Sequence, residues 1–173
     1  MRTRLATVAL TLVASGCAAA PGTPRLAAPS AAAVPEGVFA LLTGNWTGEG
    51  TLFGRPARFT MSWAPGGNGT HRLDFSNGLV DATGTVTPVL DAVAVYTPGP
   101  DGGATARWTD SRPQEISIVA EVGDSVVVSD WTAPAESGRT EYRVAADGTV
   151  RVRDWVRGGD GLRPFGDAVY RRR

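Results

Sequence analysis

Histidine, cysteine and lysine, on which much enzyme chemistry depends, are nearly absent from the chain. It has one histidine, His71, one cysteine, Cys17, and no lysine. A Ser-His-Asp triad would have to use His71, and the sequence has no Gly-x-Ser-x-Gly turn to present the serine. A zinc or iron site would lack the usual second histidine, and a Schiff base would lack its amine. We therefore predict no catalytic residue and favour a protein that is not an enzyme.

Carboxylates are the remaining candidates for acid–base chemistry. Asp110, Glu115, Glu121 and Asp130 lie near the ends of predicted strands, where two of them could share a proton. No other catalytic constellation accompanies them, so solvated strand ends are the preferred interpretation. Asp154 differs from these four, because strand alternation places it on an otherwise apolar face.

Charge balance and hydrophobic content restrict the classes of protein to which the chain could belong. Basic and acidic residues number 17 each, and loss of a signal peptide holding Arg2 and Arg4 would leave 15 against 17, a net charge of about −2. Binding nucleic acid through a broad basic surface requires clustered cations, so this balance argues against it. Hydrophobic residues make up 42% of the chain, which is enough for one core in one domain.

The N-terminal residues have the pattern of an export signal. Arg2 and Arg4 precede an apolar run at 5–14, which is too short to span a bilayer and fits the middle of a secretory signal. The following Ala14-Ser15-Gly16-Cys17 resembles the lipobox of bacterial lipoproteins. This resemblance implies acylation of Cys17, and Ala18 after it implies an anchor on the periplasmic face of the outer membrane. An ordinary signal peptide with a chance cysteine is the alternative.

Three segments follow from this pattern. Residues 1–16 are predicted to be the signal peptide, and residues 17–35 the lipidated cysteine with a disordered linker. Ala, Pro, Gly and Ser dominate the linker, which shows no periodicity and whose prolines prevent a continuous helix. Residues 36–173 are predicted to be the folded domain.

The folded domain is predicted to consist almost entirely of strands. A short helix at 36–43 ends before Gly44, and beyond it short runs of alternating polarity are separated by turn clusters. We count about ten strands joined by sequential hairpins. Closure into a single antiparallel up-and-down barrel would remove the two exposed edges. Tight hairpins are predicted at Asn77-Gly78, Gly123-Asp124 and Asp147-Gly148.

Strand alternation and composition also give candidates for an interior pocket. They are Trp63, His71, Phe75, Trp108 and Trp131. Large rings beside small residues can leave a cavity for one small apolar ligand. A small barrel can equally be filled by its own side chains, and both interpretations are open at this point.

The step Gly44-Asn45-Trp46, after a short helix and at the start of an all-β chain, resembles the calycin superfamily, which includes the lipocalins. The wider run 42–50 is similar to its nitrobindin-like branch. The resemblance implies that Trp46 closes one barrel end and that an arginine near the last strand, here Arg171, packs over it. Nitrobindin-like proteins bind haem through a histidine close to the C-terminus, and this chain has none beyond His71. We therefore expect no cofactor, with haem on His71 as the alternative.

Three functional hypotheses result. The first is a lipid-anchored envelope protein that binds a small hydrophobic or amphipathic molecule inside a calycin-like barrel. The second is a structural or partner-binding lipoprotein with a filled barrel. The third, implied by the resemblance, is a calycin-type isomerase or cyclase that uses Asp154. The expected partners are the membrane, through Cys17, and the small ligand, but not nucleic acid.

Overall fold

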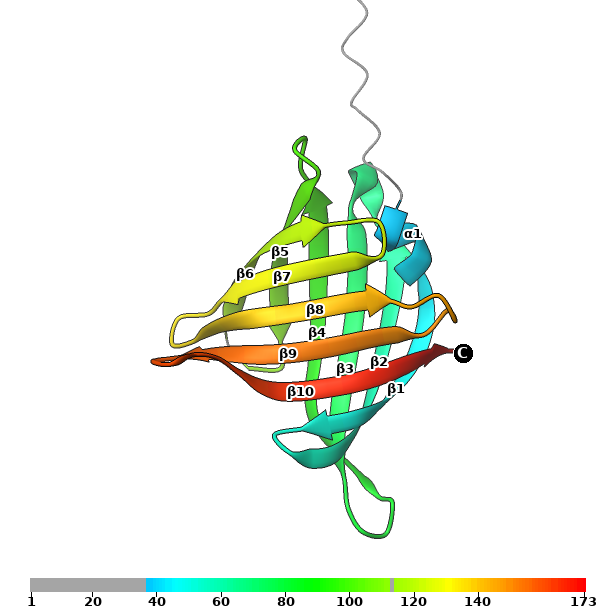
Figure 1. Ribbon diagram of the computed structural model, residues 1–173, viewed down its shortest axis with the longest axis vertical. Coiled ribbons are helices and arrows are strands. Elements are labelled where there is room, and N and C mark those ends of the chain that lie inside the picture. Colours follow the sequence, from blue (N-terminus) through cyan, green and yellow to red (C-terminus); the bar gives the residue numbers. More distant parts are fainter. Residues whose placement is uncertain (1–36, 113) are drawn as a thin grey trace, which may run out of the picture. The chain divides into compact units, whose positions relative to one another are not determined.

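The computed structural model describes residues 37–112 and 114–173, which form a closed antiparallel barrel (Figure 1). The predicted signal peptide, Cys17 and the linker lie outside the described residues. Each strand pairs with its neighbours in sequence and β1 pairs with β10, so the predicted all-β, up-and-down barrel of about ten strands is confirmed. The elements are α1 (Gly37–Leu42), β1 (Gly44–Leu52), β2 (Arg55–Pro65), η1 (Gly67–Gly69), β3 (His71–Val80), β4 (Val86–Pro98), β5 (Gly103–Asp110), β6 (Glu115–Val122), β7 (Val126–Thr132), β8 (Ser137–Val144), β9 (Val150–Gly158) and β10 (Gly161–Arg172).

Alternation of side chains explains why these segments share one interior. β6 alternates exposed and buried residues along its length, with Ile116, Ile118 and Ala120 inside. Glycine permits close packing where the barrel closes. A Cβ on Gly48 would lie 2.8 Å from the ring of Tyr170, which faces this glycine from β10.

The barrel has two different ends. The helix end holds α1 and the connections that follow β2, β4, β6 and β8, and the distal end holds those that follow the odd-numbered strands. Turns form where predicted after Val122 and Val144. The hairpin predicted at Asn77-Gly78 is wrong, because these residues form an irregularity within β3. The chain reverses at 81–85 instead, where the Asp81 carboxylate accepts hydrogen bonds from two backbone N–H groups.

Trp46 and α1 close the helix end together. Val38, Phe39 and Leu42 of α1 are buried, and only 1% of Trp46 is exposed. The indole nitrogen of Trp46 donates a hydrogen bond of 2.7 Å to the carbonyl oxygen of Leu42. This bond also satisfies a carbonyl at the C-terminus of the helix, where no intrahelical donor is available.

The cation over Trp46 is Arg172, which corrects the expectation of Arg171. The guanidinium carbon of Arg172 lies 4.3 Å from the ring centre, and its nitrogens donate to two carbonyl oxygens near the end of α1. Trp46 and Arg172 are opposite each other in the register of β1 and β10, whereas Arg171 is one residue out of phase and opposite Thr47. Gly44 is required beside them, because its φ is +130° and a Cβ there would overlap the Arg172 guanidinium.

Candidate ligand-binding cavity

A cavity of about 300 Å³ extends from the middle of the barrel to its distal end. That volume corresponds to about ten molecules of liquid water, or to a ligand of about ten to fifteen non-hydrogen atoms at protein packing density. The barrel is thus filled by its own side chains near α1 and hollow at the distal end. Each of the two interiors that the sequence allowed, filled and hollow, therefore describes one end of the barrel. The largest apolar side chains in the wall are Phe53, Phe59, Phe75, Trp108, Trp131 and Phe165.

The structure divides the five predicted pocket residues into two groups. Three of them line the cavity: Phe75, Trp108 and Trp131. Trp63 is instead buried in the core near the helix end, and the ring of His71 stacks on Phe39 with centres 4.3 Å apart. Alternation gives the face of a residue but not its height along the barrel, so the sequence could not separate the two groups.

This arrangement does not fit a haem held by His71. The His71 ring lies nearly parallel to Phe39, at 10°, and His71 is not part of the cavity wall. A cavity of 300 Å³ is also too small for a tetrapyrrole. Among residues 37–112 and 114–173, no group of three or more His, Cys, Asp or Glu side chains is placed to hold a metal ion.

The two cavity tryptophans are fixed by their neighbours. Trp131 lies against Gly138, its partner on β8, where a Cβ would overlap the indole ring. Trp108 packs on Phe75 with ring centres 5.6 Å apart, and its indole nitrogen donates to the Asp110 carboxylate at 3.1 Å. The aromatic wall is therefore organised before a ligand binds, which lowers the entropic cost of binding.

Hydroxyl groups lie on the cavity wall as well. The hydroxyls of Tyr96 and Ser129 form a hydrogen bond of 3.1 Å. Burial raises the pKa of Tyr96 to about 12 and raises the pKa of Tyr142 well above its usual value. Both phenols are therefore protonated at neutral pH. Tyr96 is not among the residues predicted from the sequence, although its alternation with Ala94 on β4 could have placed it inside.

Asp154 lines the cavity from β9, where it is partly buried, on the face that alternation predicted. The Thr140 hydroxyl donates a hydrogen bond of 2.7 Å to its Oδ1. Burial raises the pKa of Asp154 to about 6, which outweighs the opposite effect of the Thr140 hydrogen bond. The partner of Asp154 on β10 is Gly166, where a Cβ would lie 2.6 Å from Oδ2. At pH 7 the cavity thus holds an ionised carboxylate in a mainly apolar wall, a perturbed group of the kind that clusters at functional sites.

The distal mouth combines an apolar rim with an ion-paired arginine. Phe53, which is 68% exposed, stacks on Phe165 with ring centres 5.3 Å apart. Phe53 and Gly54 form the two-residue turn between β1 and β2, and their positive φ values, +51° and +73°, are those of a type I′ hairpin turn. Arg112 borders the same mouth, and its guanidinium lies 2.6 Å from Asp110 and 3.6 Å from Glu136.

The carboxylates considered as a catalytic pair do not share a site. Three of the four have an arginine of their own, as expected for polar strand ends, and no shared proton is needed to explain their positions. The ion pairs are Asp110–Arg112, Glu115–Arg107 and Asp130–Arg139.

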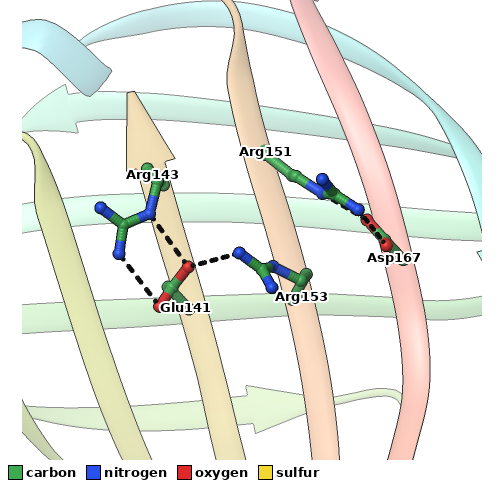
Figure 2. Close-up of polar contacts among 5 residues, drawn as sticks. All are labelled: Glu141, Arg143, Arg151, Arg153 and Asp167. Carbon is green, nitrogen blue, oxygen red and sulfur yellow. Dashed lines mark hydrogen bonds and ion pairs between the residues drawn. The ribbon is translucent and has the colours of Figure 1, made fainter. Parts of the chain in front are cut away.

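The outer face of β8, β9 and β10 carries a separate set of ion pairs, shown in Figure 2. Arg143 and Arg153 both donate to Glu141, and Arg151 donates to Asp167 at 2.7 Å. These arginine side chains are 39–51% exposed, so each pair contributes only about 0–1 kcal/mol to stability. This face has the features of a solvated barrel wall, and the cavity is the stronger candidate for a site.

Comparison with protein-family models and with curated protein sequences gave no match. The calycin resemblance of the sequence therefore stays a prediction, and the function is argued from the cavity. In the part of the chain that the structure describes, no helix is long and apolar enough to cross a membrane.

Proposed function

We propose that the protein binds one small, largely apolar molecule in the cavity of its barrel and retains it in the bacterial cell envelope. The observation that carries this proposal is the cavity of 300 Å³ with fixed aromatic rings and a few polar groups in its wall. Ligand sites have this composition, in which apolar area supplies affinity and sparse polar groups orient the ligand. A barrel that served structure alone would be more stable if larger side chains filled this space.

The distal mouth supports entry of the ligand from that end. Phe53 and Phe165 form an exposed apolar surface beside the opening, on which an apolar molecule can lose part of its hydration before it enters. The helix end is closed, because Trp46 is buried there beneath Arg172 and Phe39 of α1 packs into the core.

We further propose that acylated Cys17 anchors the barrel to the periplasmic face of the outer membrane, with residues 18–35 as the tether. The lipobox-like Ala14-Ser15-Gly16-Cys17 supports this part of the proposal. Each buried methylene of an acyl chain contributes about 0.8 kcal/mol, so several chains would hold the protein at the membrane. The calycin resemblance supports a carrier or receptor of small molecules over a purely structural role.

The indole N–H signals in ¹⁵N–¹H NMR spectra test the ligand-binding part of the proposal. Two neutral two-ring probes, naphthalene and 3-ethylindole, match the volume of the cavity. We expect each probe to shift the signals of Trp108 and Trp131, which line the cavity, and to leave Trp155 on the outer face unchanged. Absence of any shift for Trp108 and Trp131 would contradict the proposal.

A matched pair of valine variants controls for binding elsewhere. Val152 lines the cavity and is 4% exposed, whereas Val119 is 67% exposed on the outside of β6. Val152→Phe should fill part of the cavity and abolish the probe-induced shifts, and Val119→Phe should leave them unchanged. Equal effects of the two variants would place the probes outside the barrel.

A further inference from the structure

The cavity contains an acidic group with unused capacity to accept hydrogen bonds. An ionised carboxylate offers about four lone-pair positions. Among the described residues, the Thr140 hydroxyl supplies the one side-chain hydrogen bond to Asp154, and it reaches Oδ1. Gly166 of β10 makes room for the carboxylate, because Oδ2 lies where a side chain at 166 would be. A carboxylate that faces a mainly apolar cavity with a single neutral donor is a costly arrangement unless a further donor or cation approaches it.

The charged groups around Asp154 do not supply that partner. The other charged side chains in the cavity wall are Arg112 and Glu136, and Arg112 lies at the distal mouth, where it is already paired with Asp110 and Glu136. Asp167, on the outer face of β10, adds negative charge and disfavours ionisation of Asp154. The described wall therefore gives the cavity a negative electrostatic character.

We propose, on the basis of the ligand-binding function above, that the ligand is a small aromatic or similarly flat amine whose ammonium group pairs with Asp154. An ammonium would neutralise the carboxylate and donate up to three hydrogen bonds within the cavity. A ligand that ends in a carboxylate, such as a fatty acid, would bring a second negative charge into the same low-dielectric space and would be rejected.

The remaining wall fits the same ligand class. Trp108, Trp131 and Tyr142 line the cavity that Asp154 also lines, and aromatic faces attract cations as well as flat rings. The volume suits one or two fused rings with a short aminoalkyl arm, and is too small for a long acyl chain. Affinity for the ring system and selection by charge thus arise from different residues of one site.

Three probes with the same indole ring separate these contributions. Tryptamine carries an ammonium group, indole-3-propionate carries a carboxylate, and 3-ethylindole is uncharged. Isothermal titration calorimetry of the full chain at pH 7.5 measures the affinity for each probe. Because charge pairing is strong in a low-dielectric site, we expect tryptamine to bind at least about tenfold more tightly than 3-ethylindole. We expect indole-3-propionate to bind most weakly. If 3-ethylindole binds and tryptamine has no advantage over it, the amine proposal is wrong and the ligand-binding function stands. If none of the three binds, both are wrong.

Two variants test whether the preference for tryptamine over 3-ethylindole depends on the carboxylate of Asp154. Asp154→Asn removes the charge and keeps the size, so it should abolish the advantage of tryptamine while 3-ethylindole still binds. Thr140→Val keeps the charge and removes the hydroxyl, so it should retain the order of the three probes. An undiminished preference for tryptamine in a folded Asp154→Asn protein would overturn the assignment. If that variant does not fold, the order of the three probes on the unmodified protein decides the question.

Discussion

Asp154→Asn should stabilise the protein at neutral pH, because the ionised carboxylate is held in the barrel at a cost. The pKa of Asp154 is raised from 3.8 to about 6 in the folded state. A shift of that size corresponds to about 3 kcal/mol lost at pH values above 6, where the carboxylate is charged in both states. As the pH falls, the folded state takes up a proton before the unfolded state does, so the native protein regains this free energy and the variant loses its advantage. At pH 5.0, one unit below the folded pKa, about 1.4 kcal/mol of the difference should be gone.

Urea unfolding of both proteins at pH 7.5 and pH 5.0 measures this change directly. The reference is the difference between the two proteins at each pH, which removes the contribution of every other titrating group. Asp167→Asn serves as the control, because the hydrogen-bonded Arg151 lowers the pKa of Asp167. Its removal should destabilise the protein by nearly the same amount at pH 7.5 and pH 5.0, because a carboxyl whose pKa is lowered below 3.8 stays ionised in both states over this range, and the effect should decline only below about pH 4. A difference between Asp154→Asn and the unmodified protein that is independent of pH would refute the reasoning.

Other substitutions test the barrel closure, the aromatic wall and the anchor. Arg172→Ala should lower the free energy of unfolding in urea by about 1–3 kcal/mol, because it removes the cation–π contact and the hydrogen bonds of Arg172. Arg171→Ala should change the free energy of unfolding by less than about 0.5 kcal/mol. Equal effects of the two variants would contradict the register of β1 and β10. Gly138→Ala should destabilise by about 1–3 kcal/mol and alter the fluorescence of the tryptophan that covers it. Gly159→Ala, where a Cβ meets nothing within 4 Å, should do neither. Cys17→Ser should move the protein from the membrane to the soluble fraction of the envelope, and an unchanged membrane fraction would count against lipidation.

The barrel could be predicted from sequence because its main signal is local. Alternation along a strand such as Glu115–Val122 and the turn residues between strands are both visible over a few positions. The closing arginine depends on the register between the first and last strands, which are far apart in sequence. A shift of one residue in that register exchanges the two faces of a strand, and the error of one position between Arg171 and Arg172 has this origin.

The cavity could be predicted only in part. Its depth depends on how the strands tilt and shear when the sheet closes, so alternation could not tell that Trp63 packs near the helix end and that Trp108 lines the hollow part. The contact of Thr140 with Asp154 joins β8 to β9 and requires the pairing of those strands. The place of Gly166 opposite Asp154 also depends on an irregularity in β10 between Pro164 and Gly166 that no local pattern shows.

Asp154 and Gly166 together give the strongest reason to regard this part of the wall as a site. An apolar residue at 154 would be expected to increase stability by removing an interior charge, whereas a side chain at 166 would meet the Asp154 carboxylate, since a Cβ there would lie 2.6 Å from Oδ2. The two departures from a stable wall are directly opposite each other, and the glycine is what leaves room for the carboxylate. Unrelated imperfections would have no reason to coincide in this way. A binding site explains both at once, because the ligand's polar group needs the charge of Asp154 and the glycine accommodates the carboxylate that carries it.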